Sequence, residues 1–224
     1  MRCRVLVVDD QQIPRQLFEN TVAGSERYTL VAALDSAAIA DAFCAAGSVD
    51  LILMDIVTND GTNGLEAAKR IKSTYPGVKI ILVTSLPDAL FLEQAEQIGV
   101  DSFWYKELQA APLLEVMDRT MAGEHIWPDR PPETQLGLAK SSDLTDRELD
   151  VLRLLAKGLS DREISDRLHL SFNTVRYHVD NLMDKTGQNS RTALAVSAVL
   201  SGIVFPGIGT EAGGLSEDSP DGGL

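Results

Sequence analysis

One pattern governs the first 122 residues: short apolar runs alternate with stretches whose apolar residues recur at helical spacing. The helical spacing is seen, for example, at Leu65, Ala68 and Ile71. The apolar runs show no polar alternation, which is typical of parallel strands that are covered on both faces. Five such strand–helix units predict a doubly wound α/β domain with a site at the carboxyl ends of its strands. The five expected strands are Val5–Val8, Leu30–Leu34, Leu51–Met54, Ile80–Thr84 and Ser102–Tyr105.

The strand–helix pattern stops near residue 122, and three further segments follow it. Residues 123–142 contain three prolines and no periodicity, so we expect a linker there. Residues 143–205 regain helical spacing, whereas residues 206–224 are mostly Gly, Ser, Asp and Glu, a composition that predicts a disordered tail. The expected organisation is therefore a domain over 1–122, a linker, a second domain over 143–205 and a tail.

Residues 143–205 predict a small all-α domain of four helices. Thr145, with Glu148 three residues later, forms a capping-box pattern, and a serine can cap each of the next two helices. The fourth helix is expected from about Ser190 to Val204 and is apolar almost all round, more than one small domain can cover. Either a two-fold dimer contact through residues 193–204 uses the excess, or the helix is a long core helix.

The charge distribution limits the partners of the chain. A net charge of −13 argues against a protein that coats nucleic acid through bulk electrostatics. Residues 143–205 carry eight Lys and Arg against nine Asp and Glu, so DNA contact belongs in this near-neutral region and depends on a few placed cations. The apolar runs are too short to span a bilayer, so we expect no membrane partner. The N-terminal run is too short for a signal peptide, so we expect a cytoplasmic protein.

Polar residues follow the expected strands at positions that meet at one edge of a parallel sheet. Asp9 and Asp10 follow the first strand and Asp55 the third, while Thr84 ends the fourth and Lys106 follows the fifth. Three converging carboxylates repel one another unless a cation neutralises them, and their hard oxygen ligands suit Mg²⁺. This set predicts a metal-assisted phosphoryl acceptor in which Asp55 is the nucleophile, Lys106 neutralises the transferred group and Thr84 donates its hydroxyl.

These residues resemble the receiver domain of response regulators over about residues 2–121. The resemblance implies a flavodoxin-like fold with five parallel strands in the order 2-1-3-4-5. It also implies that Asp9, Asp10, Asp55 and the backbone carbonyl of Val57 hold the metal, and that Thr84 and Phe103 form a switch that repacks on phosphorylation. The step from Asp55 to Gly64 is one residue longer than receivers usually have, so the loop 57–63 beside the phosphate site is unusual. The motifs that carry the resemblance are Val7-Val8-Asp9-Asp10, Met54-Asp55-Ile56, Val83-Thr84-Ser85 and Tyr105-Lys106.

The second domain resembles the LuxR-type helix-turn-helix, on motifs that include Leu144-Thr145-Asp146-Arg147-Glu148 and Thr174-Val175-Arg176-Tyr177-His178-Val179. The order of the two domains resembles the NarL/FixJ class of response regulator. In the third helix Val175, Val179 and Leu182 share one face, so the opposite face is expected to enter the major groove. Asp180 and Asp184 also fall on that opposite face, where a carboxylate repels phosphate unless it finds a donor. The candidate DNA-binding residues are Asn173, Thr174, Arg176, Tyr177, Lys185 and Arg191.

These observations predict a phosphorylation-dependent transcriptional regulator of a two-component system, phosphorylated on Asp55 by a sensor histidine kinase and binding DNA as a homodimer. Pairing is expected through residues 193–204 or through the last two βα units of the receiver. Such a chain is a phosphoacceptor with at most weak self-dephosphorylation, not an enzyme. One alternative is a receiver that phosphorylation does not control. The other is a metal-dependent phosphohydrolase, which is less favoured because Val57 stands where such enzymes commonly have an acid.

Overall fold

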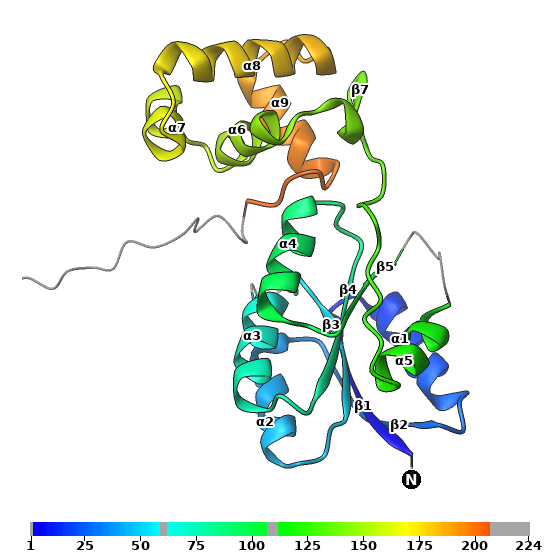
Figure 1. The fold of residues 1–224 in the computed structure, drawn as a ribbon. Coiled ribbons are helices and arrows are strands. Elements are labelled where there is room, and N and C mark those ends of the chain that lie inside the picture. Colours follow the sequence, from blue (N-terminus) through cyan, green and yellow to red (C-terminus); the bar gives the residue numbers. More distant parts are fainter. Residues whose placement is uncertain (1, 59–61, 107–111, 207–224) are drawn as a thin grey trace, which may run out of the picture.

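The computed structural model describes residues 2–58, 62–106 and 112–206, and Figure 1 shows an α/β domain followed by a helical domain. The first domain contains five parallel strands in the order β2-β1-β3-β4-β5, which confirms the doubly wound topology. Each strand agrees with its expected position to within two residues at either end. The strands are β1 (Cys3–Val8), β2 (Tyr28–Leu34), β3 (Leu51–Asp55), β4 (Lys79–Thr84) and β5 (Ser102–Tyr105).

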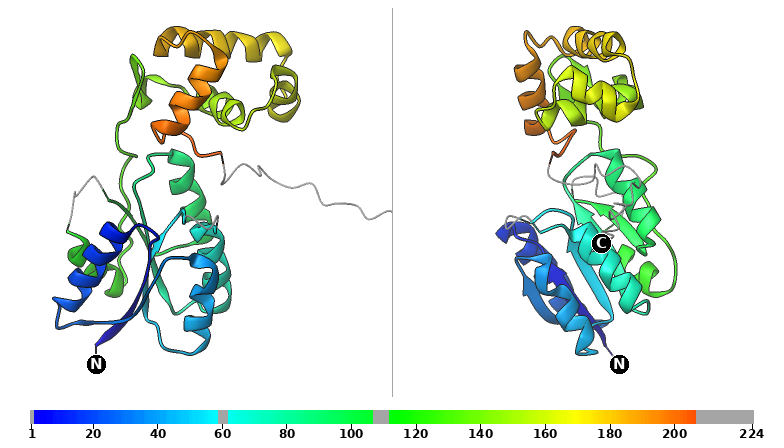
Figure 2. Two further views of the ribbon diagram at one scale, coloured as in Figure 1. Left: turned by 180° about the vertical axis from the view of Figure 1, so that it is seen from behind. Right: turned by 90° about the vertical axis from the view of Figure 1, so that its left-hand side faces the viewer.

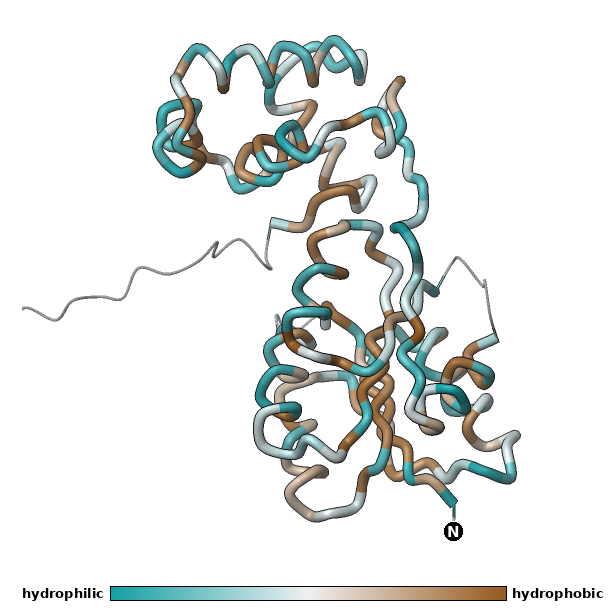
Figure 3. The backbone as a smooth tube through the Cα atoms, viewed as in Figure 1, coloured by the Kyte–Doolittle hydropathy of each residue, from teal (hydrophilic) through white to brown (hydrophobic). Residues whose placement is uncertain are grey.

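Helices cover both faces of this sheet (Figures 1 and 2). Neighbouring residues of β1 point to opposite faces, yet both sets are buried: Val5 and Val7 pack with Phe18, while Leu6 and Val8 pack into the core on the other face. This two-sided burial explains the unbroken apolar runs, which Figure 3 shows along the strands. The helices are α1 (Gln12–Ala23), α2 (Ala40–Ala45), α3 (Gly64–Thr74), α4 (Ala89–Ile98) and α5 (Leu113–Met121), with a 3₁₀ turn at Ala37–Ile39.

The second domain has four α-helices packed around its own apolar core. The Thr145 and Glu148 side chains form the expected capping box at the start of the first of them, and Ser160 begins the second in the same way. Gly187 ends the third helix in the left-handed conformation (φ 69°), which favours glycine. The helices are α6 (Asp146–Ala156), α7 (Asp161–Leu168), α8 (Phe172–Thr186) and α9 (Arg191–Leu200).

The fourth helix is shorter than the sequence predicted. It ends at Leu200 and not near Val204, because Gly202 adopts a positive φ of 73° and the chain turns. Ile203 and Val204 then pack into the domain core. Part of the apolar excess expected for this helix is thus buried by a turn within the same chain.

The segment expected to be a linker contains a short hairpin, β6 (Gln135–Leu136) with β7 (Ala139–Lys140). Leu136 is buried in the core of the second domain, and the amide of Leu138 donates to the carbonyl of Thr186 at 2.9 Å. The packed part of the second domain therefore begins before residue 143. Strands of two residues are too short to give a periodic sequence signal, which is why the pattern did not predict them.

Two sequence predictions fall partly on residues outside the described ranges: the loop 57–63, of which 59–61 are not described, and the tail 206–224, of which only Pro206 is described. Within the described ranges, none of the helices has both the length and the apolar character needed to cross a membrane.

Candidate functional site

The acidic site lies where β1 and β3 end. Val8 pairs with Met54 across these two parallel strands, so the next residues of each, Asp9 and Asp55, come to lie side by side. Asp10 joins them: one carboxylate oxygen from each of the three aspartates can be chosen so that all lie within 4.8 Å of one another. Asp9 and Asp55 are buried, so their charges are largely removed from water. The structure thus brings together the three carboxylates that the sequence predicted.

Lys106, the residue after β5, reaches into the same pocket. Its Nζ lies 2.8 Å from Asp9 Oδ2 and 2.7 Å from Asp55 Oδ2, and its side chain is only 9% exposed. Burial alone would lower the pKa of Lys106, but the Asp55 and Asp9 carboxylates outweigh it and raise that pKa above its usual value. The ammonium therefore stays charged beside the carboxylates.

For the pKa of Asp55, the effect of burial outweighs that of the neighbouring opposite charge. Burial raises its pKa to about 6, even though Lys106 acts to lower it, and the charge of Asp9 adds to the rise. Lys106 therefore does not fully offset the burial of the Asp55 carboxylate and the neighbouring charge of Asp9. A hard divalent cation with oxygen ligands would supply the missing positive charge, and the donor set fits Mg²⁺, which prefers carboxylates and keeps positions for a phosphate oxygen.

Of the other predicted receiver residues, Thr84 and Val57 lie beside this pocket, whereas Phe103 lies in the apolar core. Val83 of β4 pairs with Asp55, which places Thr84 one residue beyond the level of Asp55 in the sheet. Thr84 is buried, and its Oγ1 accepts a hydrogen bond from the amide of Leu86 at 3.1 Å. The amide of Val57 donates to Asp55 Oδ1 at 3.5 Å, and its carbonyl as a metal ligand stays a prediction. Phe103 is buried in β5, away from the carboxylates and against the ring of Tyr105, with ring centroids 5.0 Å apart.

Two further residues, Arg15 and Gly64, shape the pocket in ways that the sequence analysis did not predict. The Arg15 guanidinium on α1 donates to the carbonyl of Asp9 at 2.8 Å. Gly64 begins α3 directly against the backbone of Asp55: a Cβ built on it would lie 1.9 Å from the Asp55 carbonyl oxygen. The sequence gives no signal for Arg15, because an arginine six residues after an aspartate is ordinary on a helix surface. For Gly64 the resemblance fixes the position but not the steric reason.

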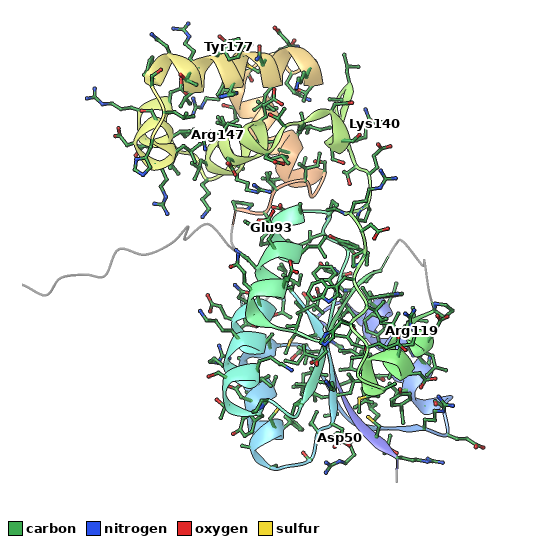
Figure 4. The ribbon with its side chains drawn as sticks, viewed as in Figure 1. Asp50, Glu93, Arg119, Lys140, Arg147 and Tyr177 are labelled. Carbon is green, nitrogen blue, oxygen red and sulfur yellow. The ribbon has the colours of Figure 1, made fainter. Side chains whose placement is uncertain are left out.

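The third helix of the second domain, α8, presents the predicted recognition face. Val175, Val179 and Leu182 are buried, as the helical spacing predicted. Asn173, Arg176 and Tyr177 are exposed, and Figure 4 shows Tyr177 on the side of α8 that faces away from the α/β domain. Asp180 and Asp184 are exposed on the same helix. The face is therefore accessible and mixes one cation with two carboxylates.

The remaining DNA-binding candidates already have partners within the protein. Lys185 Nζ lies 2.8 Å from Glu148 Oε2 and 3.0 Å from the carbonyl of Asp143, and Arg191 pairs with Asp161 and the carbonyl of Leu159. Thr174 shares a 2.7 Å hydroxyl contact with the cap residue Ser171. For these three residues a contact with DNA stays a prediction, and each has a structural role as well.

An α/β domain with a buried acidic pocket, joined to a small helical domain with an open recognition helix, defines a class of two-domain signalling regulators. Comparison with known families agrees: residues 5–118 match the family "Response regulator receiver domain", and residues 142–198 match "Bacterial regulatory proteins, luxR family". The chain belongs to the response regulators that carry a receiver domain and a LuxR-type DNA-binding domain.

Individual relatives span both domains. The response regulator protein VraR of Staphylococcus epidermidis is 30% identical over 211 residues, which cover 91% of this chain and 100% of that protein. VraR of Staphylococcus aureus is 29% identical over 209 residues, with the same coverage. Among solved structures, RcsB of Salmonella enterica serovar Typhimurium bound to promoter DNA in the presence of BeF₃⁻ is similar in fold, with a TM-score of 0.60, 19% identity, and coverage of 91% of this chain and 100% of that one.

Proposed function

We propose that a sensor histidine kinase phosphorylates this regulator on Asp55, and that the phosphorylated form binds DNA as a homodimer and controls transcription. The observation that carries the proposal is the placement of the Asp55 carboxylate beside Asp9, Asp10 and Lys106 in one buried pocket. A buried carboxylate next to a fixed cation and further metal ligands is suited to accept a phosphoryl group.

The chemistry follows from the atoms that line the pocket. A carboxylate oxygen of Asp55 attacks the phosphorus of the kinase's phosphohistidine; an O–P bond forms as the P–N bond breaks, and the imidazole leaves. Lys106, which lies 2.7 Å from Asp55 Oδ2, neutralises negative charge on the transferring group. The Thr84 hydroxyl, which accepts from the Leu86 amide, keeps its own proton free to donate to a phosphoryl oxygen.

Asp9, Asp10, Asp55 and the Val57 carbonyl would hold Mg²⁺ in this proposal. When bound, the ion adds positive charge at the phosphoryl oxygens and offsets the repulsion among the carboxylates. We expect at most slow self-dephosphorylation, because no described side chain in the pocket other than these carboxylates is placed as a general base for water.

DNA binding is assigned to the outer face of α8, with Asn173, Arg176 and Tyr177 as the exposed contacts. One near-neutral domain supplies few cations, so two copies on adjacent half-sites are needed for tight binding. The apolar side chains of Val196 (52% exposed) and Leu200 (82% exposed) on α9 offer a surface for pairing, and the last two βα units of the receiver offer a second. DNA-bound RcsB, a fold neighbour, is consistent with such a role.

The test is incubation with acetyl phosphate and Mg²⁺, followed by intact-mass and peptide mass spectrometry. We expect one added phosphoryl group on Asp55, none in Asp55→Asn, and normal addition in the control Asp41→Asn, whose carboxylate pairs with Arg70 on the surface. Gel-shift titration and light scattering of wild type and Asp55→Asn, with and without phosphodonor, then test gating. Equal affinity and equal mass in all four samples would favour a receiver that phosphorylation does not control.

A further inference from the structure

The two domains are joined by a buried ion pair. Arg153 on α6 reaches Asp88 at the start of α4 with two contacts, Nη2 to Oδ1 at 2.7 Å and Nε to Oδ2 at 3.4 Å. The Arg153 side chain is 12% exposed and that of Asp88 is 3% exposed. Two contacts between a planar guanidinium and one carboxylate fix the relative orientation of the two groups as well as their separation.

Apolar contacts also join the two domains next to the ion pair. Gly202, just after α9, lies against the receiver: a Cβ built there would be 3.3 Å from Cδ of Pro87 and 3.8 Å from a methyl carbon of Leu86. Phe205 packs against the receiver core cluster. In Figures 1 and 3 the end of α9 and the apolar residues after it lie directly over the first turn of α4. These contacts exclude water from the ion pair and so strengthen it.

The receiver side of this contact is continuous with the phosphoacceptor site. Thr84 borders Asp55, its Oγ1 holds the amide of Leu86, and Asp88 lies two residues further on. Asp88 also caps α4, since its Oδ1 accepts from the amide of Leu90 at 3.1 Å. A movement of Thr84 toward a phosphoryl group on Asp55 therefore acts on the same short loop that holds Arg153.

The contact leaves the DNA-binding surfaces open. Tyr177 on α8 is 63% exposed and lies on the side away from the receiver (Figure 4). Val196 and Leu200 on α9 are exposed as well. The ion pair therefore does not work by covering the recognition helix. What it determines is the orientation of the DNA-binding domain relative to the switch loop.

We propose that the Asp88–Arg153 pair is an interdomain strut that converts receiver dimerisation into DNA affinity. Phosphorylation pairs two receivers; the second DNA-binding domain then meets its half-site at high effective concentration only if each domain is held rigidly to its receiver. Without the ion pair, the domains are joined through the segment after α5 and looser apolar contacts. The DNA-binding domain then samples many orientations, and receiver dimerisation raises DNA affinity less. This inference rests on the proposed function.

The variant Arg153→Gln tests the strut. It removes the positive charge of residue 153 while keeping a polar side chain. The matched control Arg147→Gln removes a cation from the same helix whose guanidinium contacts Leu168 and Asp150 of its own domain. A second variant, Asp88→Asn, keeps an oxygen that can cap α4 but loses the charge. Mass spectrometry after incubation with acetyl phosphate and Mg²⁺ measures phosphoacceptor chemistry. Light scattering and gel-shift titration with beryllofluoride and Mg²⁺ measure dimer mass and DNA affinity.

We expect a gain in wild-type DNA affinity within the about 5- to 150-fold range of coupled sites. In Arg153→Gln the gain should be about tenfold smaller, or absent, although Asp55 is modified and dimers form as in wild type. Asp88→Asn should behave like Arg153→Gln, and Arg147→Gln should keep the wild-type gain. Small-angle scattering of the unmodified Arg153→Gln protein should show more separated domains than wild type.

Two results overturn the strut. One is an undiminished gain in DNA affinity in Arg153→Gln. The other is a high DNA affinity of that variant without beryllofluoride, which would mean that the ion pair inhibits DNA binding. If the wild type itself shows no gain in DNA affinity, the proposed function fails. The small-angle scattering then tests separately whether the ion pair holds the two domains together. An Arg153→Gln profile identical to that of wild type then refutes it, and a more extended profile supports the pair as what fixes the two domains.

Discussion

The indole of Trp127 stacks on the ring of Phe103, with ring centroids 6.1 Å apart and an angle of 30° between the planes. Backbone bonds fix this contact: the amide of Phe103 donates to the carbonyl of Ile126 at 2.9 Å, so the segment after α5 lies along the edge of β5. The aromatic residue assigned to the receiver switch thus touches the start of the interdomain connection directly.

This contact makes Trp127 a natural reporter of the switch. If Phe103 repacks when Asp55 is phosphorylated, the surroundings of the indole change, and its emission should shift on addition of beryllofluoride and Mg²⁺. The chain has two tryptophans, and Trp104 packs edge-on against Phe18 on the other face of the sheet. Trp104→Phe should keep the emission change and Trp127→Phe should lose it; an equal change in both variants would contradict the assignment.

Gly64 is expected to be indispensable for the geometry of the phosphoacceptor. Any side chain there meets the carbonyl of Asp55 at 1.9 Å, so α3 or the end of β3 must move. Gly64→Ala should lower the free energy of unfolding by about 1–3 kcal/mol, as overpacking does, and should slow phosphorylation of Asp55. Gly77→Ala is the control, because a Cβ there has nothing within 4 Å. Denaturant titration that shows equal loss in both variants would exclude the steric explanation.

The receiver site could be predicted from sequence because its parts depend on local signals and one topological rule. Apolar runs located the strands, and parallel strands bring their carboxyl ends to one edge, so Asp9, Asp55 and Lys106 had to converge. The pairing of Val8 with Met54 is the register that this rule requires. The helix caps at Thr145 and Ser160 were equally local, since each box spans four residues.

Contacts between charged residues that are far apart in the sequence could not be predicted in this way. Arg153 and Asp88 are 65 residues apart, and each taken alone has the pattern of a solvated helix residue. Lys185 was a plausible phosphate contact by its position on α8, but the fold places the Glu148 carboxylate 2.8 Å from its ammonium. Such ion pairs depend on how two separate elements pack against each other. The residue spacing within one element carries no information about that packing.

Tyr105 carries a hydroxyl that the fold does not use. The residue is 2% exposed, and its Oη has no hydrogen-bond partner among the described residues. Burial, together with the charge of Asp88, raises the pKa of this phenol, so it stays protonated with its donor unsatisfied. Tyr105→Phe should therefore leave the free energy of unfolding unchanged or raise it by about 1 kcal/mol, because a desolvated polar group is removed.

Tyr28 provides the matched comparison for that measurement. It is similarly buried at 3% exposure, but its hydroxyl donates to Asp118 Oδ1 at 2.8 Å. Tyr28→Phe should cost about 1.5–3 kcal/mol, the usual loss for a hydrogen bond to a charged group. If Tyr105→Phe costs as much as Tyr28→Phe in the same denaturant titration, the Tyr105 hydroxyl has a partner and the explanation is wrong.

Asp180 is expected to trade affinity for selectivity on the recognition helix. Its carboxylate is exposed on α8, one helical turn after Arg176. Near DNA it repels phosphate at every sequence, and this cost is offset only where a base presents an amino group, such as N4 of cytosine in the major groove. Asp180→Asn removes the repulsion everywhere but weakens the favourable contact at the preferred site.

Binding-site selection with the wild type, followed by gel-shift titration of Asp180→Asn on selected and scrambled DNA, tests this trade. The variant should bind scrambled DNA more tightly, and its ratio of selected to scrambled affinity should fall by a factor equivalent to about 1–3 kcal/mol, the usual value of one base contact. Asp166→Asn, a change of the same charge on α7, is the control for the general electrostatic effect. If both variants gain affinity equally on selected and scrambled DNA, Asp180 contributes charge alone and does not read a base.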